Sequence, residues 1–129
     1  MMNNVKYPSF PYVVGWSITN MCNLKCVHCN MDSGKAWANE LTTEECKRVI
    51  DELAYNRVKT ILFTGGEPLL RGDFFEIVDY ALEKQINVSV TTNGTLVTDE
   101  IIKDQFWKFQ AVRISIDSCY EKEHDAWRG

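Results

Sequence analysis

Hydrophobic and polar positions follow two different periods along this chain, one typical of strands and one typical of helices. Four short runs rich in β-branched and aromatic residues predict strands at residues 12–19, 60–64, 88–92 and 112–117. The run at 60–64 is almost continuously apolar, which is typical of a strand covered on both faces. The run at 112–117 alternates apolar and polar residues.

Between consecutive predicted strands, apolar residues recur at the spacing typical of helices. Thr42 and Glu45 predict a capping box ahead of a first helix, and Asp73 and Glu76 predict another ahead of a second. Thr98 is expected to cap a third helix, and residues 121–129 resemble the start of a fourth. The residues expected on buried helix faces are Cys46, Val49, Ile50, Leu53 and Ala54, then Phe74, Ile77, Val78, Ala81 and Leu82, then Ile101, Ile102, Phe106 and Phe109.

Strands that alternate with helices in this way predict an α/β fold with a parallel sheet and right-handed crossovers. Such sheets bind their ligands at the carboxyl ends of the strands. Four unusual segments lie at the carboxyl ends of the predicted strands, at residues 20–41, 65–68, 93–94 and 115–117, so we expect one functional rim. A sheet that ended at its fourth strand would leave an open edge, and we therefore interpret the chain as part of a longer protein.

Composition and charge exclude several classes of partner. The 129 residues include 14 Lys or Arg and 18 Asp or Glu, which gives a formal net charge of −4. This balance lacks the basic footprint of a nucleic-acid-binding protein, so no nucleic-acid partner is expected. No apolar run approaches about 18 residues, so no membrane partner is expected either. The first residues lack the apolar core of a signal peptide, and we expect a cytoplasmic protein whose cysteines bind metal or react.

Three of the five cysteines lie within eight positions, as Cys22, Cys26 and Cys29. Thiolates bind soft metals, chiefly zinc, copper(I) and iron–sulfur clusters. A structural zinc site needs four protein ligands, whereas a four-iron cluster held by three cysteines keeps one iron open for chemistry. The spacing therefore favours a catalytic [4Fe–4S] cluster. The alternative is an iron–sulfur or zinc-binding module without catalysis. In a zinc site, Cys46 or a histidine would be the fourth ligand. Without zinc, Cys46 is expected to be a core residue, and Cys119 has no expected role.

The cysteine motif, Cys-x3-Cys-x2-Cys after a first strand, resembles the signature of the radical S-adenosylmethionine (radical SAM) superfamily. The flanking residues 19–26 are similar to the opening of its peptide-modifying, SPASM-type branch. Segments 65–68, 92–94, 115–117 and 124–129 also resemble the family's pattern, so the likeness extends from Val13 to Gly129. The resemblance implies that residues 1–129 are the N-terminal portion of the radical SAM core domain. The implied fold is the first four βα units of a partial (β/α)6 TIM-like barrel.

The resemblance also implies the cofactors and the reaction. Cys22, Cys26 and Cys29 would hold a [4Fe–4S] cluster whose open iron binds the amino and carboxylate groups of S-adenosylmethionine. Reductive cleavage of that cofactor would give methionine and a 5′-deoxyadenosyl radical, which abstracts hydrogen from a substrate. The full-length protein would be an oxidoreductase-type enzyme that receives electrons from a donor such as flavodoxin or ferredoxin. Its substrate would be a peptide or a small molecule, and the isolated 129 residues are expected to be inactive.

The resemblance assigns cofactor-binding roles to residues around the cysteine loop and the second strand. His28 occupies the position near the adenine. Gly65 and Gly66, which have no Cβ, would let the backbone approach the ligand closely. The carboxylate of Glu67 would accept hydrogen bonds from the ammonium group of the cofactor.

The third and fourth strands are followed by further candidates. Ser115 and Asp117 have side chains suited to binding ribose hydroxyls. Asn93 serves either the turn or the cofactor, because Asn and Gly are turn formers in any case. Arg128 is expected to face solvent rather than to bind a cofactor carboxylate.

Overall fold

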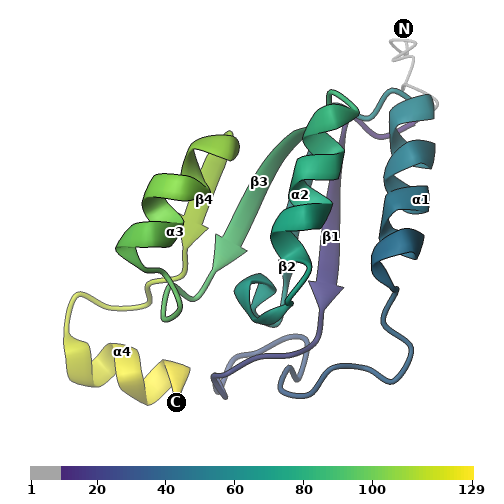
Figure 1. The fold of residues 1–129 in the computed structure, drawn as a ribbon. Helices are drawn as coiled ribbons and strands as arrows, with labels where there is room; N and C mark the ends of the chain where they lie inside the picture. The colour runs from purple at the N-terminus through teal and green to yellow at the C-terminus, as the bar shows by residue number, and fades with distance from the viewer. Residues whose placement is uncertain (1–9) are drawn as a thin grey trace, which may run out of the picture.

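The computed structural model describes residues 10–129, which form one parallel sheet flanked by helices (Figure 1). The strands are β1 (Val13–Thr19), β2 (Thr60–Gly65), β3 (Asn87–Thr92) and β4 (Ala111–Ile114). They pair in the order β1-β2-β3-β4, and each pairing is parallel. Right-handed crossovers between strands that follow one another across a sheet place the connecting helices on one face. The parallel α/β fold predicted from the sequence is confirmed.

Helices connect the strands in the predicted alternation. Those between strands are α1 (Thr43–Tyr55), α2 (Phe74–Glu83) and α3 (Asp99–Asp104), and α4 (Glu121–Arg128) follows β4. Two short 3-10 turns, η1 (Pro68–Leu70) and η2 (Phe106–Lys108), complete the connections. The capping box of Thr42 and Glu45 is present, and the Thr98 side chain accepts a hydrogen bond from the backbone N–H of Ile101, so two of the three predicted caps are confirmed.

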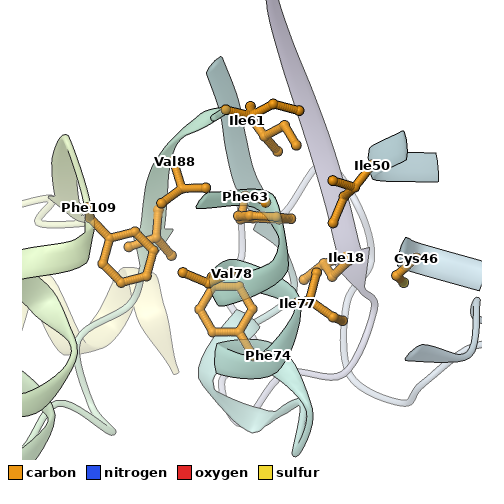
Figure 2. Packing of buried hydrophobic residues seen from close by; sticks show 13 residues of the cluster. Ile18, Cys46, Ile50, Ile61, Phe63, Phe74, Ile77, Val78, Val88 and Phe109 are labelled. Atoms are coloured by element: carbon orange, nitrogen blue, oxygen red, sulfur yellow. The ribbon is translucent and has the colours of Figure 1, made fainter. Parts of the chain in front are cut away.

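The core lies between the sheet and the helices that cover it (Figure 2). The ring of Phe74 packs edge to face against Phe63, with centroids 5.5 Å apart, and stacks on Phe109 at 6.2 Å. Cys46 is fully buried in this cluster, as expected of a small core residue. Each large apolar side chain removed from water here stabilises the fold by about 1.5–3 kcal/mol. This core fixes the positions of the strand ends that build the site.

Three sequence-based expectations about these elements are wrong. Asp73 lies at the N-cap position of α2, but its side chain makes no capping hydrogen bond, because its carboxylate binds Arg71 and Thr43 instead. Leu62 in β2 is only partly buried while its neighbours Ile61 and Phe63 are fully buried, since the helices cover a single face of the sheet. Ile102 is half exposed, because α3 is short and the chain changes to a 3-10 turn before Phe109 reaches the core.

The carboxyl ends of the strands meet at one rim, toward the bottom of Figure 1, where the loop after β1 and helix α4 also lie. Strand β4 ends at Ile114, three residues earlier than predicted, so residues 115–117 lie on this rim rather than in the sheet. In the part of the chain that the structure describes, no helix is long and apolar enough to cross a membrane.

Candidate metal and cofactor site

The loop that carries the three clustered cysteines is closed at its base by backbone hydrogen bonds. The N–H of Gly34 donates to the carbonyl of Asn20 at 2.9 Å, and the N–H of Cys22 donates to the carbonyl of Gly34 at 3.1 Å. Inside the loop, the N–H of Cys29 donates to the carbonyl of Cys26 at 3.1 Å and forms a tight turn. The three thiols are therefore presented by a short, closed segment rather than by an open chain.

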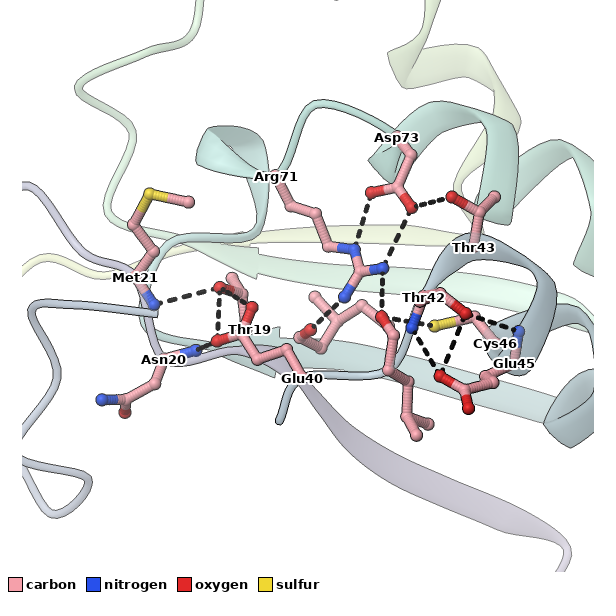
Figure 3. A network of polar contacts seen from close by, with 12 residues as sticks. Thr19, Asn20, Met21, Glu40, Thr42, Thr43, Glu45, Cys46, Arg71 and Asp73 are labelled. Carbon is pink, nitrogen blue, oxygen red and sulfur yellow. Dashed lines mark hydrogen bonds and ion pairs between the residues drawn. The ribbon is translucent and has the colours of Figure 1, made fainter. Parts of the chain in front are cut away.

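Glu40 fastens this loop to the end of β1, a role that the sequence analysis missed (Figure 3). Its carboxylate accepts hydrogen bonds from the Thr19 hydroxyl and from the backbone N–H groups of Asn20, at 2.7 Å, and Trp37, at 3.1 Å. Burial opposes its ionisation, but these hydrogen bonds outweigh that effect and hold the pKa of Glu40 below its ordinary value. The two ends of the loop are thus held by one carboxylate.

Arg71 forms a second brace behind the loop, which the sequence analysis also missed (Figure 3). Its guanidinium donates to the backbone carbonyls of Ile18, at 3.0 Å, and Leu41, at 2.7 Å. Asp73 binds the same guanidinium through both carboxylate oxygens, at 2.7 and 3.0 Å. The Arg71 side chain is only 9% exposed, so this brace joins the end of β1, the end of the loop and the start of α2 inside the fold.

Gly65 and Gly66 allow two strand ends to cross at close range. A Cβ on Gly66 would lie 2.2 Å from the carbonyl oxygen of Met21, and a Cβ on Gly65 would lie 2.3 Å from that of Thr19. Gly65 also has φ of +134°, which L side chains rarely adopt. The close approach expected of these glycines therefore exists, but the space that a Cβ would fill is occupied by the backbone after β1.

Glu67 is fully buried and its carboxylate binds other parts of the protein. It accepts hydrogen bonds from the backbone N–H groups of Leu69, at 3.1 Å, and Asn93, at 2.8 Å, and from the Thr92 hydroxyl, at 2.8 Å. Glu67 does not line the cavity described below. The expected contact with a cofactor ammonium group therefore has no support in this geometry, because the carboxylate serves to join the ends of β2 and β3.

Asn93 connects the turn after β3 to the cysteine loop. Its Oδ1 accepts hydrogen bonds from the N–H of Thr95 at 2.9 Å and from the Thr95 hydroxyl at 2.7 Å, so it organises its own turn. Its Nδ2 donates to Asn23 at 2.9 Å, directly beside Cys22. The turn role expected for Asn93 is present, and the same side chain also borders the cavity.

The three thiols share one cavity of about 300 Å³ on the rim. Loop residues, the ends of β2 and β3, Ser115 and α4 all contribute to its walls. Of the residues predicted from the sequence, those that line it are Cys22, Cys26, His28, Cys29, Gly65, Gly66, Asn93 and Ser115. Eight of the ten residues predicted for the site therefore line this cavity.

All three thiols are free, which keeps them available as ligands. A hydrogen bond donated by the N–H of Ser33 to Cys29 Sγ lowers the pKa of this thiol, although burial acts in the opposite direction. The lowered pKa favours the thiolate, which is the form that binds metals. Among residues 10–129, no three His, Cys, Asp or Glu side chains are gathered closely enough to hold a metal ion. The donor set is nevertheless that of an iron–sulfur site, with three thiols on one loop and a cavity beside them.

Helix α4 closes one side of this cavity. Arg128 is mostly buried rather than facing solvent, and its Nε lies 2.6 Å from Asp117 Oδ2. The prediction for Arg128 was therefore wrong, because α4 packs onto the cysteine loop, where the N–H of Val27 donates to the carbonyl of Trp127 at 3.0 Å. Asp117 does not line the cavity; its carboxylate faces the Arg128 guanidinium, and the expected contact with a ribose stays a prediction.

The two remaining cysteines lie elsewhere. Cys46 is buried in the core, where burial raises the pKa of its thiol. It does not line the cavity of the clustered thiols, so a zinc site completed by Cys46 has no support in this geometry. Cys119 is exposed after β4.

Comparison with known proteins gives a consistent result. Residues 16–129 match the family profile described as the Radical SAM superfamily. Over 92% of its length, the chain is 42% identical to the mycofactocin maturase MftC of Mycolicibacterium smegmatis and 41% identical to the AdoMet-dependent heme synthase of Methanosarcina barkeri. It covers 31% and 35% of these proteins, so it spans about a third of the length of the curated relatives it matches.

A solved structure shows the same arrangement of strands and helices. Streptococcus suis SuiB bound to S-adenosylmethionine superimposes with a TM-score of 0.81 at 21% identity, over 94% of this chain and 28% of SuiB. The structure of SuiB bound to its precursor peptide SuiA gives a TM-score of 0.82. At this identity the likeness concerns the fold, which is that of the partial barrel expected from the sequence.

Proposed function

The chain belongs to the radical SAM superfamily, and from this premise we propose that Cys22, Cys26 and Cys29 hold a [4Fe–4S] cluster in a radical SAM enzyme. The family uses this cluster together with S-adenosylmethionine. When bound, the two cofactors supply reductive cleavage of S-adenosylmethionine and, with it, abstraction of hydrogen from a substrate. The observation that carries the proposal is that three free thiols on one closed loop share a cavity with the ends of β2, β3 and the residues after β4.

The cavity walls suggest how this chain's residues contribute. Gly65 and Gly66 line the cavity, so a bound ligand would lie against the end of β2. Asn93 and Ser115 present polar groups that suit hydroxyl and amino groups, and His28 contributes an imidazole ring for contact with a purine. Glu67 and Asp117 support these walls from outside the cavity, through the contacts described above.

The same proposal covers the domain assignment, the type of enzyme, its location in the cell and its electron donor. Residues 1–129 form the N-terminal portion of the core domain. The chain corresponds to about a third of each relative, and the rest of the barrel is expected in the part of the protein that corresponds to their other two thirds. The enzyme is an oxidoreductase-type catalyst that works in the cytoplasm. A small electron carrier such as flavodoxin or ferredoxin supplies its electrons.

The relatives favour a peptide substrate, with a second class as the alternative. SuiB is named with a bound precursor peptide, and MftC is named as a maturase. A heme synthase is also 41% identical to the chain, which favours a small molecule instead. The side chains that select between these substrates are expected outside the 129 residues, which span only about a third of the length of these relatives.

The proposal is tested by anaerobic reconstitution of the full-length protein with iron and sulfide. The Cys26→Ala variant is expected to lose about four irons relative to the wild type, together with production of 5′-deoxyadenosine under dithionite. The matched control is Cys119→Ser, which changes an exposed thiol outside the cavity and is expected to retain both. Equal iron content and equal cleavage in Cys26→Ala, or zinc in place of iron in the wild type, would contradict the proposal.

A further inference from the structure

Arg128, the last residue of α4, directs one nitrogen at the sulfur of Cys26. Its Nη1 lies 3.8 Å from Cys26 Sγ, within reach of an N–H···S hydrogen bond, and its side chain is only 16% exposed. The neighbouring residues Val27 and Trp127 are joined by a backbone hydrogen bond of 3.0 Å. The contact between Arg128 and Cys26 is therefore supported by two backbone segments that are themselves bonded to each other.

Asp117 holds the guanidinium from its other side. Its Oδ2 lies 2.6 Å from Arg128 Nε, but without the alignment of a hydrogen bond, so the contact is an ion pair. The backbone N–H of Asp117 donates to His124 Nδ1 at 3.3 Å, which fixes the segment that carries the carboxylate. His28 Nε2 lies 3.7 Å from the same Oδ2. The carboxylate thus positions the guanidinium and offsets part of its charge.

We propose that Arg128 is a positioning residue that raises the reduction potential of the cluster through the Cys26 sulfur, and that Asp117 limits the size of this effect. The inference rests on the proposed function, because it assumes that Cys26 is a cluster ligand. Reduction adds one negative charge to the cluster. Hydrogen bonds to the ligand sulfurs and local charge set the potential of such a site. A guanidinium that is mostly buried acts more strongly than a solvent-exposed charge, because salt and water screen it less.

The test is an anaerobic potentiometric titration of the reconstituted full-length protein, followed by EPR in the absence of S-adenosylmethionine. Omission of S-adenosylmethionine separates the effect on the cluster from any contact between Arg128 and the cofactor. Arg128→Gln is expected to reduce the ratio of reduced to oxidised cluster about tenfold at a fixed potential, which corresponds to about 59 mV for one electron. Arg128→Lys keeps the positive charge and is expected to shift the ratio by less than threefold. Lys122→Gln, which removes an exposed charge from the same helix, is the matched control and is expected to change nothing.

Asp117→Asn supplies a test of opposite sign. It removes the charge that offsets the guanidinium, so it is expected to increase the ratio of reduced to oxidised cluster several-fold. A role confined to folding would shift the two variants in the same direction or leave both potentials unchanged. Opposite shifts in Arg128→Gln and Asp117→Asn therefore support the inference.

The remaining outcomes are decisive as well. Unchanged potentials in both variants, with full iron content, overturn the inference and leave the proposed function intact. If Arg128→Gln fails to take up iron, Asp117→Asn decides the question, since a positive shift supports the inference and any other result overturns it. A wild-type protein that binds no cluster contradicts the proposed function, and the inference fails with it.

Discussion

The carboxylate of Glu67 accepts a hydrogen bond from the backbone N–H of Asn93 at 2.8 Å, which ties the end of β2 to the turn after β3. The same carboxylate also accepts hydrogen bonds from Leu69 and Thr92, and it is removed from water completely. A buried carboxylate with three donors is costly to replace, because each donor left without a partner keeps its desolvation penalty. Glu67 is thus a structural link between two strand ends of the rim.

Replacing Glu67 with Gln is expected to destabilise the protein by about 1–3 kcal/mol. The amide retains one acceptor oxygen, but its NH₂ group meets a backbone or hydroxyl donor where the carboxylate had an acceptor. The measurement is the urea midpoint of the full-length apoprotein, with Glu83→Gln as control, since Glu83 is exposed at the end of α2. Equal midpoints for the two variants would show that the carboxylate contributes little to this link.

Replacing Gly66 with Ala is expected to disrupt the crossing of the β1 and β2 ends. The added Cβ would lie 2.2 Å from the Met21 carbonyl oxygen, which itself accepts a hydrogen bond from the N–H of Glu67 at 2.7 Å. Overpacking of this kind costs about 1–3 kcal/mol or more, because backbone rather than a flexible side chain must move. Gly72→Ala is the matched control, since nothing lies within 4 Å of its added Cβ. The measurement is the yield of folded protein and its melting temperature, and a normal melting temperature for Gly66→Ala is the result that contradicts this expectation.

The sequence predicted the framework of this site better than it predicted its supports. Period and turn chemistry are local properties, so the alternation of strands and helices, the capping box at Thr42 and the shared rim follow from short segments of sequence. The spacing of the cysteines likewise identified a group of residues that line one cavity. Each of these features can be predicted without knowing which residues far away in the sequence contact it.

The supports depend on distant partners and therefore escaped prediction. Glu40 binds the end of β1 some twenty residues earlier, and Arg71 reaches back to Ile18. Nothing in the local sequence separates these two charges from the solvated Asp, Glu, Lys and Arg residues elsewhere in the chain. Arg128 was misjudged for the same reason, because the packing of α4 on the cysteine loop is a tertiary contact.

Replacing Glu40 with Gln is expected to loosen the cysteine loop in a pH-dependent way. The pKa of Glu40 is lowered below its ordinary 4.5, since hydrogen bonds from Asn20, Trp37 and Thr19 outweigh the opposing effect of burial. A carboxylate with a lowered pKa contributes stability above the pKa of the unfolded state, and this contribution disappears as the pH falls through the folded-state pKa. The difference between wild type and Glu40→Gln is therefore expected to be largest near pH 7 and to shrink below about pH 4.5.

Hydrogen–deuterium exchange of residues 20–41 measures this loosening directly. The two proteins are compared at each pH, so that the intrinsic change of exchange rate with pH cancels. Glu52→Gln serves as control, because Glu52 lies exposed on α1. A difference that stays constant from pH 7 to pH 4 would show that the negative charge of Glu40 does not hold the loop.

Residues 1–129 expressed alone are expected to produce no 5′-deoxyadenosine, whereas the full-length protein produces it. Within the described residues, β4 pairs with β3 on one edge and carries Ile114 and, just after it, Ile116, which are 50% and 70% exposed. An unpaired edge with exposed apolar side chains promotes association between copies, and a cavity that is not enclosed admits water to the reacting atoms. The assay is anaerobic, with dithionite as reductant and chromatography of the nucleoside product, and size-exclusion chromatography follows association. Repeated turnover by the 129 residues alone, at a rate comparable to that of the full-length protein, would show that four strands suffice to enclose the site.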